Sequence, residues 1–410
     1  MTTSKQKLSK LTSLISSGST PLGGDKNYLD EGPVLFIRSQ NVLMNKLDLS
    51  DAVYVSEDIH CKMKRTHVSY GDVLLNITGA SIGRVAPFSL RNVQANVNQH
   101  VCIIRPDRDL LDSSYLSYLI SSPAFQAEIN RIQRGGTRQA LTFGQIAEFE
   151  IPISSITHQR QTVNLLDKIR SLLELRQQAI EKLEQLGFAI FEELLQRNQA
   201  ATRIRALGDV AQEGRGTFVN GPFGSDLLTS ELVETGVPVI YIRDIRSGNY
   251  HRVSKAFVTQ DKADQLKVCS VHPGDVLVAK VGDPPGVAAV YPSAEPKAIV
   301  TQDVIRIRVD KNKATPEYVA CFLMSAIGKS RIKGITVEAT RARFSLQDFK
   351  KLDIELPPIS EQLQFTQSIN RISFLRSKCL NQLSRLSQLY AAVVHSAFTP
   401  EPETTALSVR

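Results

Sequence analysis

The chain is poor in cysteine, and its cysteines are scattered. Its 410 residues include five cysteines, and no two of them form a C-x-x-C pair. Zinc sites and disulfide frameworks both need cysteines at short, recurring spacings. The sequence therefore argues against a structural zinc site and a disulfide-stapled domain, and it favours the reduced cytoplasm. The five residues are Cys61, Cys102, Cys269, Cys321 and Cys379.

Long hydrophobic runs are also missing. No apolar stretch approaches the roughly 18 residues that span a bilayer. The first seven residues are not followed by the apolar segment of a secretory signal. We therefore expect neither membrane insertion nor secretion. With 42% hydrophobic and 22% charged residues, the composition is ordinary for a globular protein, and 410 residues predict two or three domains.

Known catalytic motifs are absent from the sequence. It contains no G-x-x-x-x-G-K-[ST], no G-x-G-x-x-G after a strand, no H-E-x-x-H and no G-x-S-x-G. Residues 283–286, D-P-P-G, resemble the [DN]-P-P-[aromatic] motif of amino-methyltransferases, but Gly286 stands where the aromatic ring would be. We interpret this segment as a turn between strands. The sequence predicts no catalytic residue, no metal site and no cofactor in this chain.

The chain repeats itself after about 203 residues. Gly71-Asp72-Val73-Leu74-Leu75 matches Gly274-Asp275-Val276-Leu277-Val278, and single landmarks follow at the same distance. Upstream, V-L-F-I-R at 34–38 matches V-I-Y-I-R at 239–243 after a two-residue slip. The period is too long for a solenoid, whose units have 20 to 50 residues. It indicates a duplicated domain and therefore two related sites. The landmarks are Gly83 with Gly286, Gln99 with Gln302, Tyr115 with Tyr318, and Thr137-Arg138 with Thr340-Arg341.

Each repeat begins with about 150 residues of short mixed elements. β-Branched runs next to Gly, Pro, Asp or Asn predict strands. Helices are expected at 113–132 and 316–332, the second capped by Thr315 before Pro316. The fold class is therefore α+β, with an α/β module present twice. The expected strands are 34–37, 73–75, 101–104, 237–242, 276–278 and 304–307.

A long helix is predicted after each module, at 157–199 and 360–398. Apolar residues recur there at alternating spacings of three and four, the pattern of a coiled-coil seam. The partner that best covers each stripe is the other helix, and the alternative is packing on the helix's own domain. The seam consists of Leu166, Ile169, Leu173, Ile180, Leu183, Ile190 and Leu194 with Phe365, Ile369, Ile372, Cys379, Leu383, Leu386, Tyr390 and Val393.

The two helices are expected to run antiparallel. In a tandem duplication each helix leaves its module in the same way, so a pseudo-twofold molecule requires opposite directions. The second helix carries basic residues such as Arg376, and the first supplies glutamates such as Glu184. We predict modules at 1–156 and 201–358, long helices at 157–200 and 359–398, and a flexible tail at 399–410. The modules would then lie at opposite ends of a rod.

Basic and amide side chains gather where the predicted strands end. The net charge of +8 and the pI near 9.2 permit a polyanionic partner without requiring one. Arg, Lys, Asn and Gln are the side chains that recognise base edges, although each would also be ordinary on a solvated loop. The candidates for DNA binding are Arg38, Gln40, Asn41, Asn76, Arg134, Thr137, Arg138, Arg243, Lys280, Arg331, Lys333, Thr340, Arg341 and Arg343.

Several motifs resemble the specificity subunits of type I restriction–modification systems. G-P-F-G-S-D-L at 221–227 is similar to the family's G-P-F-G-S-x-L, and G-D-V-L at 274–277 is similar to its G-D-[IV]-L. The strand ending in I-R at 242–243 and L-P-P-I-S-E-Q at 356–362 also match. Residues 171–183 resemble the central conserved helix. The resemblance covers almost the whole chain, twice and in the same order.

The first repeat departs from this pattern at three places. Gly18-Ser19-Thr20-Pro21 stands where Gly221-Pro222-Phe223-Gly224 stands later, residues 151–154 replace L-P-P, and His158-Gln159 replaces E-Q. The strand and helix landmarks persist, so the fold expectation stands. The departures imply that the two modules recognise different sequences.

The resemblance implies a non-catalytic subunit with two target-recognition domains, each reading one half of a split, asymmetric site in double-stranded DNA. It also implies two copies of an adenine methyltransferase subunit that carry S-adenosylmethionine, and an ATP-driven restriction subunit. Modules on one face of B-DNA lie about 34 Å apart, one helical turn, so a rigid helix pair would measure the spacer. The alternatives are a single-chain DNA methyltransferase and a structural adaptor that binds protein.

Overall fold

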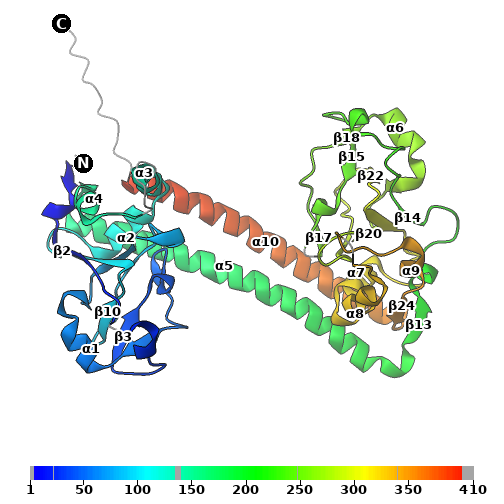
Figure 1. Ribbon diagram of the computed structural model, residues 1–410. Helices are drawn as coiled ribbons and strands as arrows, with labels where there is room; N and C mark the ends of the chain where they lie inside the picture. Colours follow the sequence, from blue (N-terminus) through cyan, green and yellow to red (C-terminus); the bar gives the residue numbers. More distant parts are fainter. Residues whose placement is uncertain (1–3, 22, 134–139, 247, 339, 399–410) are drawn as a thin grey trace, which may run out of the picture. The chain divides into compact units, whose positions relative to one another are not determined.

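The computed structural model describes residues 4–21, 23–133, 140–246, 248–338 and 340–398, which form two compact units (Figure 1). Unit 1 takes its described residues from Met1–Arg176 and Gln382–Arg410, and unit 2 consists of Gln177–Asn381. Each unit therefore contains one module and a segment of both long helices. The predicted tail at 399–410 lies outside the described residues, as do Arg134, Thr137 and Arg138.

Unit 1 contains two four-stranded sheets. The first has the order β2-β11-β8-β9 and is antiparallel throughout. The second has the order β6-β3-β10-β7, in which β3 and β10 run parallel. The strands are β2 (Thr12–Ser17), β11 (Val101–Pro106), β8 (Val73–Asn76), β9 (Val85–Pro87), β6 (Val53–Val55), β3 (Val34–Ile37), β10 (Gln94–Val97) and β7 (His67–Val68).

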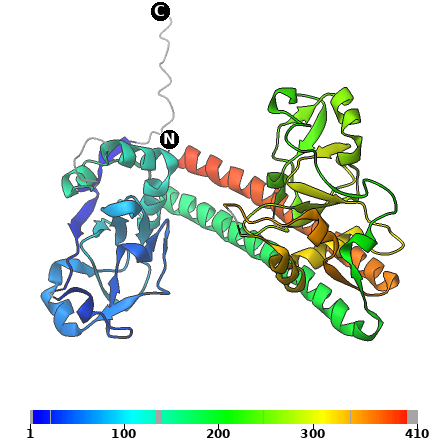
Figure 2. The same cartoon turned by 45° about the vertical axis from the view of Figure 1, so that its right-hand side comes forward.

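Unit 2 repeats both sheets in the same order, as β14-β23-β20-β21 and β18-β15-β22-β19. Strands β15 and β22 are again the parallel pair. In both views the sheet with β15 and helix α6 (Gln260–Gln265) lies farther from the long helices than the sheet with β23 (Figures 1 and 2). The strands are β14 (Phe218–Asn220), β23 (Val304–Ile307), β20 (Val276–Ala279), β21 (Ala288–Val290), β18 (Phe257–Val258), β15 (Val237–Ile240), β22 (Ala298–Val300) and β19 (Ser270–Val271).

All six predicted strands are present, but the one expected at 237–242 ends at Ile240 and is followed by a 3-10 helix at Ile242–Asp244. The two-residue slip between the repeats is wrong. Val97 pairs with Ile37 on β3, and Val300 pairs with Ile240 on β15. Since 300 − 97 and 240 − 37 are both 203, the offset is constant here. Arg38 therefore corresponds to Tyr241 and not to Arg243. The similar sequences at 34–38 and 239–243 suggested a two-residue shift between the repeats, but the strand pairing shows no such shift.

The shorter helices correct a second expectation. Each predicted helix, 113–132 and 316–332, is two helices: α2 (Ser113–Ser121) with α3 (Pro123–Gln133), and α7 (Pro316–Met324) with α8 (Ala326–Ile335). Pro123 disfavours helical geometry in the residue before it, and Ser122 is extended. Ser325 is also extended, and its Oγ accepts from the Gly328 N–H as the cap of α8. The predicted cap Thr315 is confirmed, since its Oγ accepts from the Tyr318 N–H at 3.3 Å.

The two long helices, α5 (Ile156–Arg197) and α10 (Ile359–Phe398), pack antiparallel. In unit 1, Leu166 near the start of α5 shares a hydrophobic core with Phe398 at the end of α10. In unit 2, Leu194 near the end of α5 shares a core with Phe365 near the start of α10. The predicted direction is confirmed, and the helix ends pack on the module cores as well as on each other.

The predicted seam is confirmed along both helices. Every seam residue is buried or half-buried, and so are Arg176, Gly187 and Arg376, which fill the gaps. A β-carbon on Gly187 would come within 3.7 Å of Ile369, so the helices approach closely there. The Arg376 guanidinium binds the Glu184 carboxylate at 2.8 Å, as the charge pattern indicated.

A buried glutamine joins each module to its long helix. Gln159 and Gln362 are equivalent and almost completely buried. Their Oε1 atoms accept from the Asp112 and Thr315 N–H groups, and their Nε2 atoms donate to the carbonyls of Ser154 and Pro357. The glutamine of the E-Q motif therefore joins the module to the helix. The first repeat has His158 in place of Glu361 and still forms the glutamine's hydrogen bonds.

Candidate nucleic-acid interface

Both units contain a polar corner where the strand ends meet. The first corner comprises 18–21, 38–41, 76–79, 98–100 and 140, and the second comprises 221–224, 241–244, 279–283, 301–303 and 340–343. Backbone hydrogen bonds join these segments, for example Asn98 N–H to Ile37 at 3.1 Å and Thr301 N–H to Ile240 at 3.0 Å. The two corners are thus built alike, and their side chains differ.

A glycine leads the chain into each corner. The N–H of Gly18 donates to Val101, and that of Gly221 donates to Val304. A β-carbon on Gly18 would overlap the carbonyl oxygen of Val97, and one on Gly221 would overlap that of Val300. Only glycine allows the chain to pass so close to the neighbouring strand. This explains why the glycine persists although the residues after it differ.

In the first corner, two candidates support the loop and do not face solvent. Asn41 is fully buried, accepts from the Arg38 N–H at 2.9 Å and donates to Asp51 at 2.7 Å. Asn76 is also fully buried and donates to the Ser39 carbonyl at 2.7 Å. Neither amide is placed to touch DNA in this structure. Their role is to fix the backbone that carries the exposed residues.

Arg38 and Gln40 lie nearer the surface of the first corner. Arg38 is half-buried and donates to the Asp51 backbone carbonyl at 2.5 Å. Gln40 is exposed and donates to the Asp51 carboxylate. Both side chains therefore share one acidic residue, Asp51, as their partner. The predicted residues Arg134, Thr137 and Arg138 lie outside the described residues, next to Ala140, which pairs with Thr78.

The second corner brings four candidates together. Arg343 pairs with Val281 next to Lys280, and the Gly282 N–H donates to Ala342 at 3.2 Å. Thr340, Arg341 and Arg343 are all exposed, and Lys280 is half-buried. This juxtaposition joins two segments 60 residues apart in the sequence into one basic edge. A basic edge of this kind suits contact with phosphate.

Arg243 belongs to the same corner, and neighbouring side chains hold its guanidinium in place. Its guanidinium stacks over the Tyr241 ring, 4.6 Å from the centroid, and donates to Ser254 at 2.7 Å. The buried Asp244 fixes the loop by accepting from the N–H groups of Tyr241, Val253 and Ser254. Asp244 is the counterpart of Asn41, so both corners use a buried side chain for the same turn.

Two further candidates lie on helix α8. Arg331 donates to the Asp353 carbonyl at 2.6 Å and pairs with Glu355, so it holds α8 against β24 (Asp353–Leu356). Lys333 is exposed near the end of the same helix. No described contact places either residue in the second corner.

The segment 283–286, which resembles a methyltransferase motif, lies in the turn between β20 and β21, as expected.

Each corner also contains an exposed glutamine that was not among the predicted site residues. Gln99 is exposed, accepts from the Thr20 hydroxyl, and lies 3.1 Å from His100. Gln302 is exposed at the equivalent position, followed by Asp303. The match between Gln99 and Gln302 was the available signal, but it served only to align the repeats. A cavity of about 210 Å³ adjoins Gln302, and it is lined by Pro222, Gly224, Leu227, Leu228, Thr229, Leu232, Tyr241, Thr301, Gln302 and Asp303.

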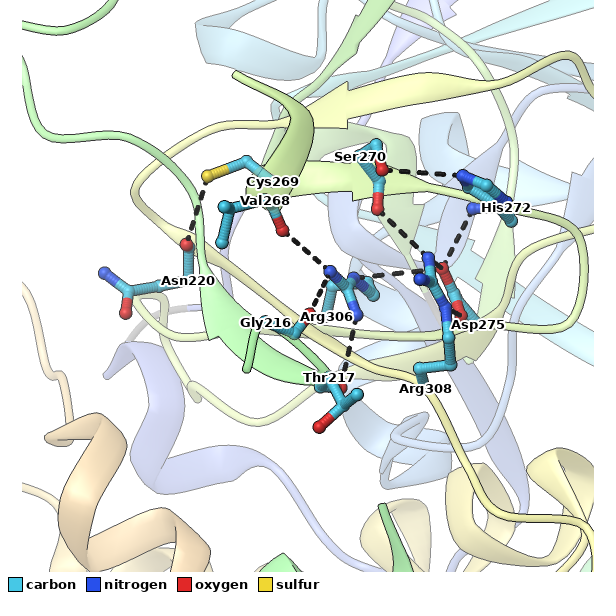
Figure 3. A network of polar contacts seen from close by, with 10 residues as sticks. All are labelled: Gly216, Thr217, Asn220, Val268, Cys269, Ser270, His272, Asp275, Arg306 and Arg308. Atoms are coloured by element: carbon cyan, nitrogen blue, oxygen red, sulfur yellow. Dashed lines mark hydrogen bonds and ion pairs between the residues drawn. The ribbon is translucent and has the colours of Figure 1, made fainter. Parts of the chain in front are cut away.

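An acid–arginine network lies behind each G-D-V-L motif. Asp72 binds Arg105 at 2.7 Å, and its counterpart Asp275 binds Arg308 at 2.9 Å. In unit 2 the network also contains Arg306, which is 1% exposed and donates to the carbonyls of Gly216, Thr217 and Val268 (Figure 3). The equivalent residue in unit 1 is Ile103.

Burial controls the electrostatics of this network. Desolvation lowers the pKa of Arg306 to about 10, against the favourable charge of Asp275. Burial also lowers the pKa of His272, and the charge of Arg308 acts in the same direction. These groups hold strands and loops together, so the network has a structural role. Among the described residues, no group of three or more His, Cys, Asp or Glu is arranged to hold a metal ion.

None of the helices in the described ranges is both long and apolar enough to cross a membrane.

A duplicated α+β frame whose two polar corners differ defines a protein with two related but unlike binding sites. Residues 7–185 and 206–373 both match the family model of the type I restriction modification DNA specificity domain. The chain belongs to this family and contains its domain twice.

Individual relatives agree with this assignment. The chain is 20% identical to the type I restriction enzyme EcoKI specificity subunit of Escherichia coli (strain K12), over 92% of this chain and 84% of that protein. It is 18% identical to the StySPI specificity subunit of Salmonella potsdam, with the same coverage. The type I restriction–modification S subunit from M. genitalium shares the fold, with a TM-score of 0.63 at 14% identity over 98% of this chain and 97% of that chain.

Proposed function

We propose that each polar corner recognises one half of a split site in double-stranded DNA. The observation that carries the proposal is the contrast within the repeat. The two four-stranded sheets and the helices from α1 onward recur at an offset of 203 residues, whereas most of the exposed corner residues differ. Two unlike half-sites require such a shared frame with different contacts. Basic residues such as Arg341 and Arg343 would contact phosphate and set the register, and the exposed amide side chains would contact bases.

The helix pair would set the distance between the half-sites. Two contacts on one face of B-DNA are separated by about 34 Å or a multiple of it. A paired helix of about 40 residues is stiff, because each helix covers the apolar stripe of the other. The length of α5 and α10 would therefore select the number of unread base pairs. The arrangement of the modules at opposite ends of a rod stays a prediction.

The long helices also suggest two identical partners. Leu172 and Leu375 are equivalent and 43% exposed, and Leu186 and Leu389 are equivalent and 47% and 48% exposed. Exposed leucines that recur at the same positions of a repeat fit a surface that binds the same protein twice. We assign this surface to two methyltransferase subunits, which would carry S-adenosylmethionine. A restriction subunit that uses ATP would join them in the cytoplasm, and this chain would hold no cofactor.

Selection of DNA from a random duplex pool tests the proposal. The chain should be combined with its methyltransferase subunit, and the bound DNA should be sequenced. We expect one split site with two different halves and a fixed spacer. A pool that shows no enriched site would contradict the proposal. The same preparation without the partner should transfer no methyl group to DNA, because turnover by this chain alone would favour the single-chain methyltransferase.

A further inference from the structure

The turn that precedes β11 in unit 1 and β23 in unit 2 holds two adjacent polar side chains, the first exposed and the second half-buried, on a hydrogen-bonded backbone. In unit 1, Asn98 binds Ile37, and the His100 carbonyl accepts from the Ile77 N–H at 2.9 Å. In unit 2, the Asp303 carbonyl accepts from the Lys280 N–H at 2.8 Å. The turn is thus bonded to a strand end on either side. Side chains on so rigid a support can recognise a defined partner geometry.

The first position of this turn is the same in both units. Gln99 and Gln302 are both exposed, and each lies two residues before an inner strand of its sheet, β11 or β23. A glutamine amide offers one donor and one acceptor side by side. This pair matches the acceptor N7 and the donor N6 of adenine in the major groove.

The surroundings of this position differ between the units. In unit 1, Gln99 belongs to a polar chain with Thr20 and His100, and His100 contacts the Thr78 hydroxyl. In unit 2 the counterparts of Thr20, Thr78 and His100 are Phe223, Val281 and Asp303. Phe223 is 68% exposed, although aromatic side chains are mostly buried.

We propose, resting on the DNA-recognition function above, that Gln99 and Gln302 each contact one base and that His100 and Asp303 set the identity of the neighbouring base. The equivalent glutamines would select adenine in both half-sites. Asp303 accepts hydrogen bonds and suits the N4 amino group of cytosine. His100 lies within its polar chain and would favour a different base. One turn would thus supply both the shared and the distinguishing contacts of the split site.

The test is DNA selection with the complete complex of this chain and its methyltransferase subunit. Gln302→Ala should relax one base pair of one half-site by roughly 5- to 150-fold, the loss expected for one bidentate contact. Gln99→Ala should do the same in the other half-site only. Gln161→Ala and Gln196→Ala are matched controls, since these glutamines are exposed on α5 in units 1 and 2. A thermal unfolding midpoint equal to that of the wild type would show that each variant is folded.

An exchange of the second position tests the distinguishing role. Asp303→His should change the preferred base at the neighbouring position of its half-site and leave the other half-site unaltered. His100→Asp should introduce a preference for cytosine in the other half-site. If the wild-type complex selects a split site but all four variants select it unchanged, the inference is wrong. A uniform loss of affinity with unchanged base preference would also overturn it, because it would show phosphate contacts. If the wild type selects no site, the proposed function itself fails.

Discussion

Gly18 and Gly221 hold the same place in the two repeats, and at both a β-carbon would overlap a carbonyl oxygen of the neighbouring strand. The overlap involves Val97 in unit 1 and Val300 in unit 2, the last residues of β10 and β22. The entry to each polar corner is therefore fixed by backbone packing. The residues that follow these glycines are free to differ because they do not share this restriction.

Replacement of Gly221 by alanine should lower the free energy of unfolding by about 1–3 kcal/mol, the usual cost of forcing an extra group into a packed site. Urea unfolding followed by circular dichroism measures this change. Gly224→Ala is the matched control, since a β-carbon there meets nothing within 4 Å. Equal stability of the two variants would show that the backbone can move apart at Gly221 without cost.

The two aspartates of the G-D-V-L motifs should differ in their contribution to stability. Asp275→Asn removes the charge next to Arg306, whose side chain is 1% exposed and lies 3.8 Å away. A buried arginine left without its counter-charge costs about 3–5 kcal/mol. Asp72→Asn should cost less, because Arg105 is 35% exposed and water can solvate it. The comparison is made by urea unfolding of both variants, and a larger loss for Asp72→Asn would refute it.

His272 should make the chain less stable in mild acid. Its pKa lies below the ordinary 6.5 in the folded protein, because burial and then Arg308 disfavour the charged ring. The unfolded chain therefore takes up the proton at a higher pH than the folded chain does, and the contribution of His272 to stability falls as the pH falls through 6.5. The difference in unfolding free energy between wild type and His272→Gln, measured from pH 8 to pH 5, isolates this effect. A difference that does not vary with pH would contradict it.

The cysteines should react at very different rates. Burial raises the pKa of Cys102 and of Cys321 to about 12, so little reactive thiolate forms at neutral pH. Cys61 is exposed. Iodoacetamide should therefore modify Cys61 first, as mass spectrometry of timed digests would show. The same digest in urea is the control, since all five thiols should then react at similar rates.

The repeated leucines of the long helices should contribute to binding of the methyltransferase subunit. Leu172→Ser and Leu375→Ser should each weaken one of two binding events by roughly 1 kcal/mol, because each leucine is 43% exposed and binding can bury only that part of its surface. Calorimetric titration would resolve the two events. Leu363→Ser is the control, because Leu363 is 51% exposed but its counterpart is Arg160. Unchanged binding by both test variants would show that the methyltransferase subunit does not bind at these leucines.

The sequence was most informative where one local rule decides the outcome. Alternating apolar spacing predicted the seam of α5 and α10 residue by residue, because a helix face follows directly from its period. The sequence was less informative where contacts with other residues decide the local structure. The break between α7 and α8 arises where Gly328 passes so close to Phe322 that a β-carbon would overlap its carbonyl oxygen. Periodicity alone carries no trace of such a contact.

The candidate site divides in the same way. The sequence by itself determined that the chain contains two related modules, two long paired helices and basic or amide residues at the strand ends. Only the tertiary structure decided which of those residues face solvent. Asn41 and Asn76 are buried and form hydrogen bonds inside the first corner, whereas Gln99 and Gln302 are exposed on the turns between β10 and β11 and between β22 and β23. Exposure depends on what the rest of the chain packs against a residue, and that information is not local.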